Sequence, residues 1–175
     1  TRPELAVLLA YAKIAAFDRL IASPVPDDPY FARELYRYFP SALKEQYPGA
    51  IETHRLRREV IATTLANAMI NRGGPAFFSK LVAIPAADPG AVALAYAAAR
   101  DAFDLQALNA QIDALDATIS GQTQLALYAQ VQKLLVAATL WFLRNETFAS
   151  GLSAVITRYG EGVAEIRTHL SELSS

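Results

Sequence analysis

The side chains of this sequence that could do chemistry are carboxylates, amides and two histidines. The chain has 175 residues and no cysteine, so thiol catalysis, disulfides, iron–sulfur clusters and cysteine-based zinc sites are excluded. The histidines, His54 and His169, lie far apart in the sequence, and neither has a partner at metal-binding helical spacing. We therefore expect no metal site in this chain.

One glycine pattern resembles the beginning of a dinucleotide-binding fingerprint. Gly160-Glu161-Gly162 has the first spacing of that motif, but Glu165 stands where the third glycine is needed. The motif also requires a preceding strand, and the residues before Gly160 have helical periodicity. A phosphate-binding Walker loop is absent as well, because Gly73-Gly74 is followed by Pro75. We expect no cofactor-binding residue in this chain.

The most informative polar pattern is a stripe of amide and hydroxyl side chains. Thr63, Asn67 and Asn71 recur every four residues, so they share one line along a helix, within a stretch that has no charge between Glu59 and Arg72. If these amides are buried, each needs a hydrogen-bond partner, because an unsatisfied one costs about 1–3 kcal/mol. The alternatives are hydrogen bonding between helices and a polar contact with a ligand or a neighbouring domain.

A cluster of basic residues precedes this stripe. His54-Arg55-Leu56-Arg57-Arg58 places three arginines within four positions, and they spread around the expected helix. A solvated face and a docking surface for an acidic partner both fit the pattern. The candidate domain-interface or buried polar residues are therefore Arg55, Arg57, Arg58, Thr63, Asn67, Asn71 and Arg72.

These residues must be positioned by helices, because apolar residues recur every three or four positions and no stretch alternates for long enough to be a strand. Starts are indicated by the Thr1/Glu4 capping box and by Asp-Pro and Ser-Gly pairs. We predict an all-α bundle of about eight to nine helices around a central helix near residues 50–71. The expected ranges are 1–22, 28–39, 41–46, 50–71, 76–83, 88–103, 104–118, 120–144 and 153–173.

Charge and hydropathy exclude several classes of partner. The formal net charge of −1 gives no basic surface for nucleic acid. The longest stretch without charge, from Ala117 to Gln132, is shorter than the about 20 apolar residues that span a membrane. We expect a cytoplasmic protein that binds neither nucleic acid nor membrane. The chain has no initiator methionine, and we expect one helical domain, 1–175, cut from a longer chain.

Several strings of this sequence, in the same order, resemble the C-terminal helical region of the large bacterial NAD-specific glutamate dehydrogenases. The resemblance covers most of the chain, is strongest before about residue 80, and weakens after Asn145. The strings are Arg2-Pro3-Glu4-Leu5-Ala6-Val7-Leu8-Leu9-Ala10-Tyr11-Ala12-Lys13, Asp27-Asp28-Pro29-Tyr30, Tyr38-Phe39-Pro40, His54-Arg55-Leu56-Arg57-Arg58-Glu59, Ala66-Asn67, Asn71-Arg72-Gly73-Gly74-Pro75, Phe103-Asp104-Leu105 and Trp141-Phe142-Leu143-Arg144-Asn145.

The resemblance implies a parent oxidoreductase that deaminates L-glutamate to 2-oxoglutarate and ammonia and passes hydride to NAD. In that family the dinucleotide fold and the catalytic lysine and aspartate precede this region, so no catalytic or NAD-binding residue carries over. We expect an accessory, non-catalytic segment that supports packing, assembly or regulation. Its expected partners are the catalytic domain of the same chain and, through the parent enzyme, further copies. The alternative is an autonomous helical interaction module with no enzymatic parent.

Overall fold

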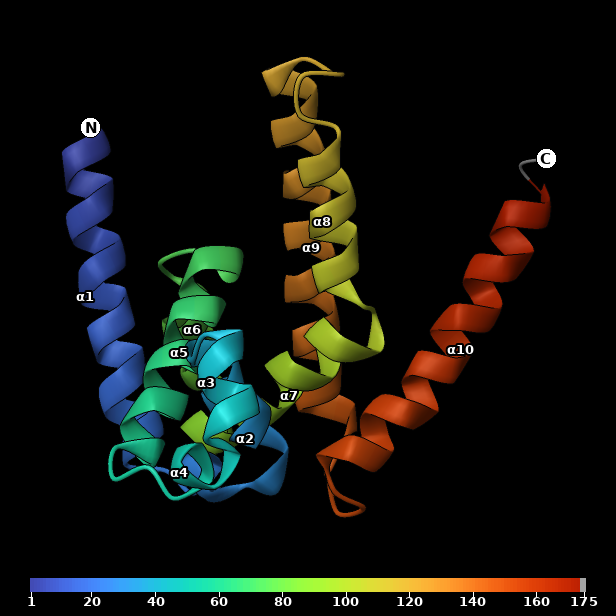
Figure 1. Cartoon of the computed structure of the whole chain (residues 1–175). Helices are drawn as coiled ribbons and strands as arrows, with labels where there is room; N and C mark the ends of the chain where they lie inside the picture. The colour runs from blue at the N-terminus through green and yellow to red at the C-terminus, as the bar shows by residue number, and fades with distance from the viewer. Residues whose placement is uncertain (174–175) are drawn as a thin grey trace. The chain divides into compact units, whose positions relative to one another are not determined.

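The computed structural model describes residues 1–173 and confirms the all-α class. The described residues form ten α-helices and two short 3-10 helices, η1 and η2 (Figure 1). The count is one above the predicted range because the helix expected at 50–71 is divided in two. The elements are α1 Arg2–Ile21, η1 Val25–Asp27, η2 Pro29–Phe31, α2 Ala32–Tyr38, α3 Ser41–Gln46, α4 Pro48–Glu52, α5 Arg57–Gly73, α6 Phe77–Val82, α7 Pro89–Ala102, α8 Leu105–Ala114, α9 Gly121–Asn145 and α10 Leu152–Leu173.

The chain divides into two compact units, Thr1–Ala93 and Leu94–Ser175. The first contains α1 to α6 and the beginning of α7, and the second contains the rest of α7 with α8 to α10. That the two units act as one domain stays a prediction.

The predicted helix starts are confirmed at most positions. Asp28 and Asp88 each accept a hydrogen bond of 2.8 Å from a backbone N–H two or three residues ahead, and Ser120 accepts one of 3.1 Å. These side chains satisfy donors that the first helical turn leaves without partners. Asp104 differs, because it precedes α8 in a left-handed conformation, with φ of 45°, and its side chain makes no capping hydrogen bond.

The predicted helix over 50–71 is interrupted between α4 and α5. Thr53 turns back on α4, donating its hydroxyl to the Gly49 carbonyl at 2.8 Å. The His54 Nδ1 accepts the Leu56 backbone N–H at 3.1 Å. Side chains that bond to nearby backbone groups compete with the helical ladder, which accounts for a break without a proline or glycine at this point.

Helix α5 is the centre of the first unit, as the sequence predicts for this region. It packs against α1, α2, α6 and η1. Its buried side chains are at positions 61, 62, 65, 66, 69 and 70, which form one broad apolar face. Of residues 60–70, only Thr63 is exposed. The helix therefore fixes the neighbouring elements of this unit relative to one another.

Helix α1 is covered only in part by the rest of its unit. Leu5, Leu8, Leu9, Ala12 and Ala16 share one face of the helix, and Ala16 is fully buried. Leu5 and Leu8, however, are 50% and 54% exposed. The buried side chains of α1 lie only in its last two turns, which are the turns that the rest of the unit covers.

The second unit is built from α8, α9 and α10 after the end of α7. Helices α8 and α9 form a helical hairpin joined by residues 115–120, and the Gln124 side chain donates to the Ile112 carbonyl at 3.1 Å. Trp141 and Phe142 of α9 meet the Tyr159 ring of α10 edge to face, with centroids 5.4 and 5.0 Å apart. Phe142 is 1% exposed, so this aromatic cluster anchors α10 to α9.

Among the described residues, one helix is long and apolar enough to cross a membrane by length and composition alone. It is α9, with a mean hydropathy of 1.3 over 18 residues, of which 22% are buried. A single helix of this kind is a weak indication, because the core helix of a water-soluble protein passes the same test. The absence of a membrane partner stays a prediction.

Candidate functional site

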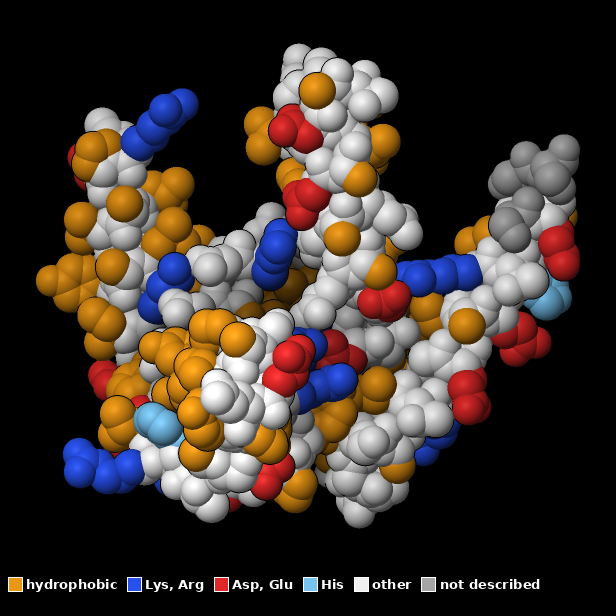
Figure 2. All heavy atoms as spheres, in the orientation of Figure 1, with side chains coloured by type: hydrophobic (Ala, Val, Ile, Leu, Met, Phe, Trp, Pro, Cys, Tyr) orange, Lys and Arg blue, Asp and Glu red, His pale blue; other side chains and the backbone are white. Residues whose placement is uncertain are grey.

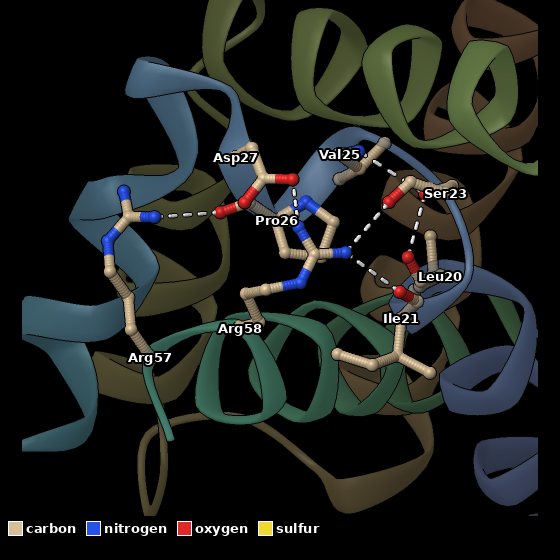
Figure 3. Close-up of polar contacts among 8 residues, drawn as sticks. All are labelled: Leu20, Ile21, Ser23, Val25, Pro26, Asp27, Arg57 and Arg58. Carbon is tan, nitrogen blue, oxygen red and sulfur yellow. Dashed lines mark hydrogen bonds and ion pairs between the residues drawn. The ribbon is translucent and has the colours of Figure 1, made fainter. Parts of the chain in front are cut away.

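The basic cluster lies at the beginning of α5 and faces the loop that leaves α1. The first two residues of α5, Arg57 and Arg58, are both half-buried. Their side chains reach residues 21–27, more than 30 positions earlier in the sequence (Figure 3). We refer to Arg57 and Arg58 as the arginine clasp.

Arg58 binds the C-terminal end of α1. Its Nη2 donates to the carbonyl oxygens of Ile21 and Ser23 at 2.9 and 3.3 Å, and its Nη1 pairs with the Asp27 carboxylate. The last carbonyls of a helix have no partner within the helix and carry partial negative charge. A guanidinium suits this position because its planar fork donates to several acceptors at once.

Arg57 and the loop's own side chains complete the contact. The Arg57 Nη1 donates to the Pro26 carbonyl at 3.1 Å, and Pro26 itself is buried. The Ser23 hydroxyl donates to the Leu20 carbonyl at 2.7 Å and accepts the Val25 N–H at 3.3 Å. The loop between α1 and η1 is therefore held both by hydrogen bonds from the arginines of α5 and by hydrogen bonds of its own Ser23 side chain.

The structure thus assigns different surroundings to the basic residues of the candidate set. Arg57 and Arg58 bind the chain's own backbone, whereas Arg55 is exposed in the turn before α5 and Arg72 is exposed at the end of that helix. A docking surface that used all of these arginines would require Arg57 and Arg58 to release their contacts with residues 21–27. Docking of an acidic partner at Arg55 stays a prediction.

The polar stripe of α5 lies at its surface rather than in its core. Thr63 and Asn71 are exposed and Asn67 is half-buried, so the interpretation as a buried stripe is wrong for Thr63 and Asn71. These polar side chains are exposed because the apolar face of α5, which includes residues 61, 65 and 69, is the face that packs against the core. The polar line lies on a different side of the helix and faces outward. The other interpretation, a polar contact with a neighbouring domain, stays a prediction.

Sequence reasoning missed the acceptors of the clasp. Asp27 comes directly before the helix start at Asp28-Pro29, and nothing local in the sequence indicates that it pairs with Arg58. A cation 31 positions away becomes its partner only when α1 and α5 pack. Among residues 1–173, no group of three or more His, Asp or Glu side chains is arranged to hold a metal ion.

Comparison with known proteins gives a match along the whole chain. The family profile described as "Glutamate dehydrogenase, C-terminal" matches residues 1–175. The chain is 43% identical to the NAD-specific glutamate dehydrogenase of Halomonas elongata over 147 residues, which are 84% of this chain and 9% of that protein.

Two further relatives give the same result. The chain is 35% identical to the NAD-specific glutamate dehydrogenase of Pseudomonas aeruginosa, covering 99% of this chain and 11% of that protein. With the enzyme of Mycobacterium tuberculosis the identity is 29%, over 98% of this chain and 10% of that protein. The chain therefore spans about a tenth of the length of these relatives, and it belongs to the NAD-specific glutamate dehydrogenase family as a C-terminal region.

Proposed function

We propose that this chain is an accessory, non-catalytic helical part of an NAD-dependent glutamate dehydrogenase. The parent enzyme oxidatively deaminates L-glutamate to 2-oxoglutarate and ammonia and transfers hydride to NAD, which binds in another part of the polypeptide. The observation that carries the proposal is the coverage: a whole-chain match to the C-terminal region of the family, and about a tenth of each relative.

The candidate site supports a structural role. Its two half-buried cations, Arg57 and Arg58, hold the end of α1 and the following loop against α5. A catalytic cation instead faces a substrate or a cofactor across an open site. The clasp serves to keep α1 at a fixed place on the central helix of the first unit.

In this function the partner of the chain is the catalytic part of its own polypeptide. The exposed side of the stripe, Thr63 and Asn71, with Arg55 and Arg72, offers polar contacts to that part. The parent enzyme assembles as a homo-oligomer, to which this region contributes support. The whole polypeptide is cytoplasmic and binds neither nucleic acid nor membrane.

The test removes residues 1–175 from the full-length enzyme and measures three properties: glutamate oxidation, assembly by light scattering, and thermal unfolding. We expect the truncated enzyme to lose assembly or thermal stability and, with them, part of its activity. We also expect the separate chain to restore these properties when it is added back. A truncated enzyme that is unchanged in all three would refute the proposal.

A further inference from the structure

Helix α1 has a second apolar surface, on the side away from α5. Val7, Tyr11 and Ile14 are 55%, 69% and 57% exposed. We name these three residues the outer stripe of α1. Figure 2 shows apolar side chains along the visible side of this helix.

The outer stripe is a continuous line and not a scatter of single residues. Val7, Tyr11 and Ile14 follow the spacing i, i+4 and i+7, which places them on one side of a helix. Val7 and the buried Ala16 are about two and a half turns apart, so they point in opposite directions. The first half of α1 is therefore apolar around most of its circumference, which is typical of a helix buried on several sides.

The charges around the outer stripe argue against an anionic membrane as its occupant. Glu4 and Asp18 lie on the same line as Val7, Tyr11 and Ile14, one at each end. Helices that lie on membranes instead place lysine and arginine beside the apolar face. An apolar protein surface is the better complement to a stripe with acidic ends.

The length of the relatives indicates which protein surface covers the outer stripe. About nine tenths of each relative's polypeptide lies outside the matched region, and the matched family region is C-terminal. A C-terminal region has part of its polypeptide before it, and α1 is the element nearest to that part in the sequence. A covalently linked surface is present at an effective concentration near the millimolar range, so it outcompetes a second copy in dilute solution.

We propose that the outer stripe of α1, formed by Val7, Tyr11 and Ile14, docks onto an apolar surface of the preceding part of the same glutamate dehydrogenase polypeptide. The inference rests on the proposed function and adds the surface through which this region contacts the rest of the enzyme. It also explains why a helix of this length has apolar side chains on the side that the first unit leaves uncovered.

The direct test is a photochemical cross-link in the full-length enzyme. Tyr11 is replaced by p-benzoylphenylalanine, which keeps the para-substituted phenyl ring and adds a photoreactive benzoyl group, and the cross-linked residue is identified by mass spectrometry. The matched control places the same residue at the exposed Glu45 of α3. We expect the cross-link from position 11 to join residues that precede Thr1 in the same polypeptide, with a yield well above that from position 45.

Three results would overturn the proposal: a cross-link that joins two copies of the enzyme, one whose other end lies within residues 1–175, and a yield no higher than that of the control. A second measurement uses Tyr11→Asp in the full-length enzyme. Proteolytic cleavage next to α1 should become about tenfold faster, the factor for losing roughly one buried apolar side chain. An unchanged cleavage rate would also overturn it.

The failure of this proposal and the failure of the proposed function can be distinguished. If this region proves necessary for assembly or stability but position 11 fails to cross-link, the docking surface is wrong and the accessory role stands. If the separate chain oxidises glutamate, the accessory role fails whatever position 11 contacts.

Discussion

The arginine clasp makes a quantitative prediction about stability. Arg58→Met keeps most of the apolar stem and removes the guanidinium that donates to the Ile21 and Ser23 carbonyls at 2.9 and 3.3 Å. Hydrogen bonds from a charged group contribute about 1.5–3 kcal/mol when buried, and a cation at a helix C-terminus contributes about 0.3–1 kcal/mol. Because the Arg58 side chain is 39% exposed, we expect a net loss of about 1–3 kcal/mol.

The ion pair with Asp27 should contribute less than these backbone contacts. The Asp27 side chain is 58% exposed, and exposed ion pairs are worth about 0–1 kcal/mol. Asp27→Ala should therefore cost clearly less than Arg58→Met. The matched control is Arg55→Met, which changes an exposed arginine of the same cluster and should stay within about 0.5 kcal/mol of the unsubstituted chain.

The assay is urea unfolding followed by circular dichroism. For a slope of about 1–3 kcal/mol per molar urea, a loss of 2 kcal/mol lowers the midpoint by roughly 1 M. The reasoning would be refuted by an Arg58→Met midpoint equal to that of Arg55→Met. An Asp27→Ala loss as large as that of Arg58→Met would show that the ion pair, and not the carbonyl contacts, holds the loop.

Two further substitutions test local packing and protonation. Gly73→Ala should destabilise by about 1–3 kcal/mol in urea unfolding, because an added Cβ would overlap the buried Phe77 ring; Gly49→Ala, with no atom within 4 Å, should be neutral or stabilising. The Tyr36 hydroxyl donates a hydrogen bond to the Glu52 carboxylate, with 2.5 Å between the oxygens, and this bond raises the pKa of Tyr36, with desolvation and the Glu52 charge acting in the same direction. The stabilisation from this raised pKa is therefore present below the ordinary tyrosine pKa of about 10 and is lost as the pH rises through the raised value. Titration by NMR should show an elevated pKa for Tyr36 that Glu52→Gln returns to the ordinary range.

Each of these has a contrary outcome. Equal stability of the Gly73→Ala and Gly49→Ala chains would mean that the close approach of α5 and α6 relaxes without cost. A Tyr36 that titrates identically with and without the Glu52 carboxylate would show that the hydrogen bond is not formed in solution.

Local signals in the sequence predicted most of the helices. Asp28, Asp88 and Ser120 mark true helix starts because a capping side chain needs only the next two or three residues. The end of α5 was predicted for a similar reason, since Gly74 takes a φ of 94° that favours glycine. These features depend on nearest neighbours in the chain, so tertiary contacts did not alter them.

The features that were not predicted depend on competition between side-chain and helical hydrogen bonds, or on contacts between residues far apart in the sequence. The break before α5 arises because His54 and Thr53 bond to the backbone in a region whose hydrophobic periodicity continues. The contact of Arg58 with the end of α1 requires two helices to pack first. Which sides of α1 are covered also cannot be read from a helix whose apolar residues occupy both sides.

The burial of the polar stripe could not be predicted, for the same reason. Periodicity correctly placed Thr63, Asn67 and Asn71 on one line of α5, but it could not show which line faces the core. Burial of that helix is decided by neighbours from α1, α2 and α6, whose arrangement is a property of the whole unit.

The central claim is that this region supports a glutamate dehydrogenase without taking part in its chemistry. The most direct measurement is calorimetric titration of NAD into two pieces of the enzyme, the polypeptide lacking residues 1–175 and the separate chain. The account predicts that NAD binds the truncated enzyme and gives no binding heat with the chain. NAD binding by the separate chain, together with glutamate-dependent reduction of NAD, would contradict it.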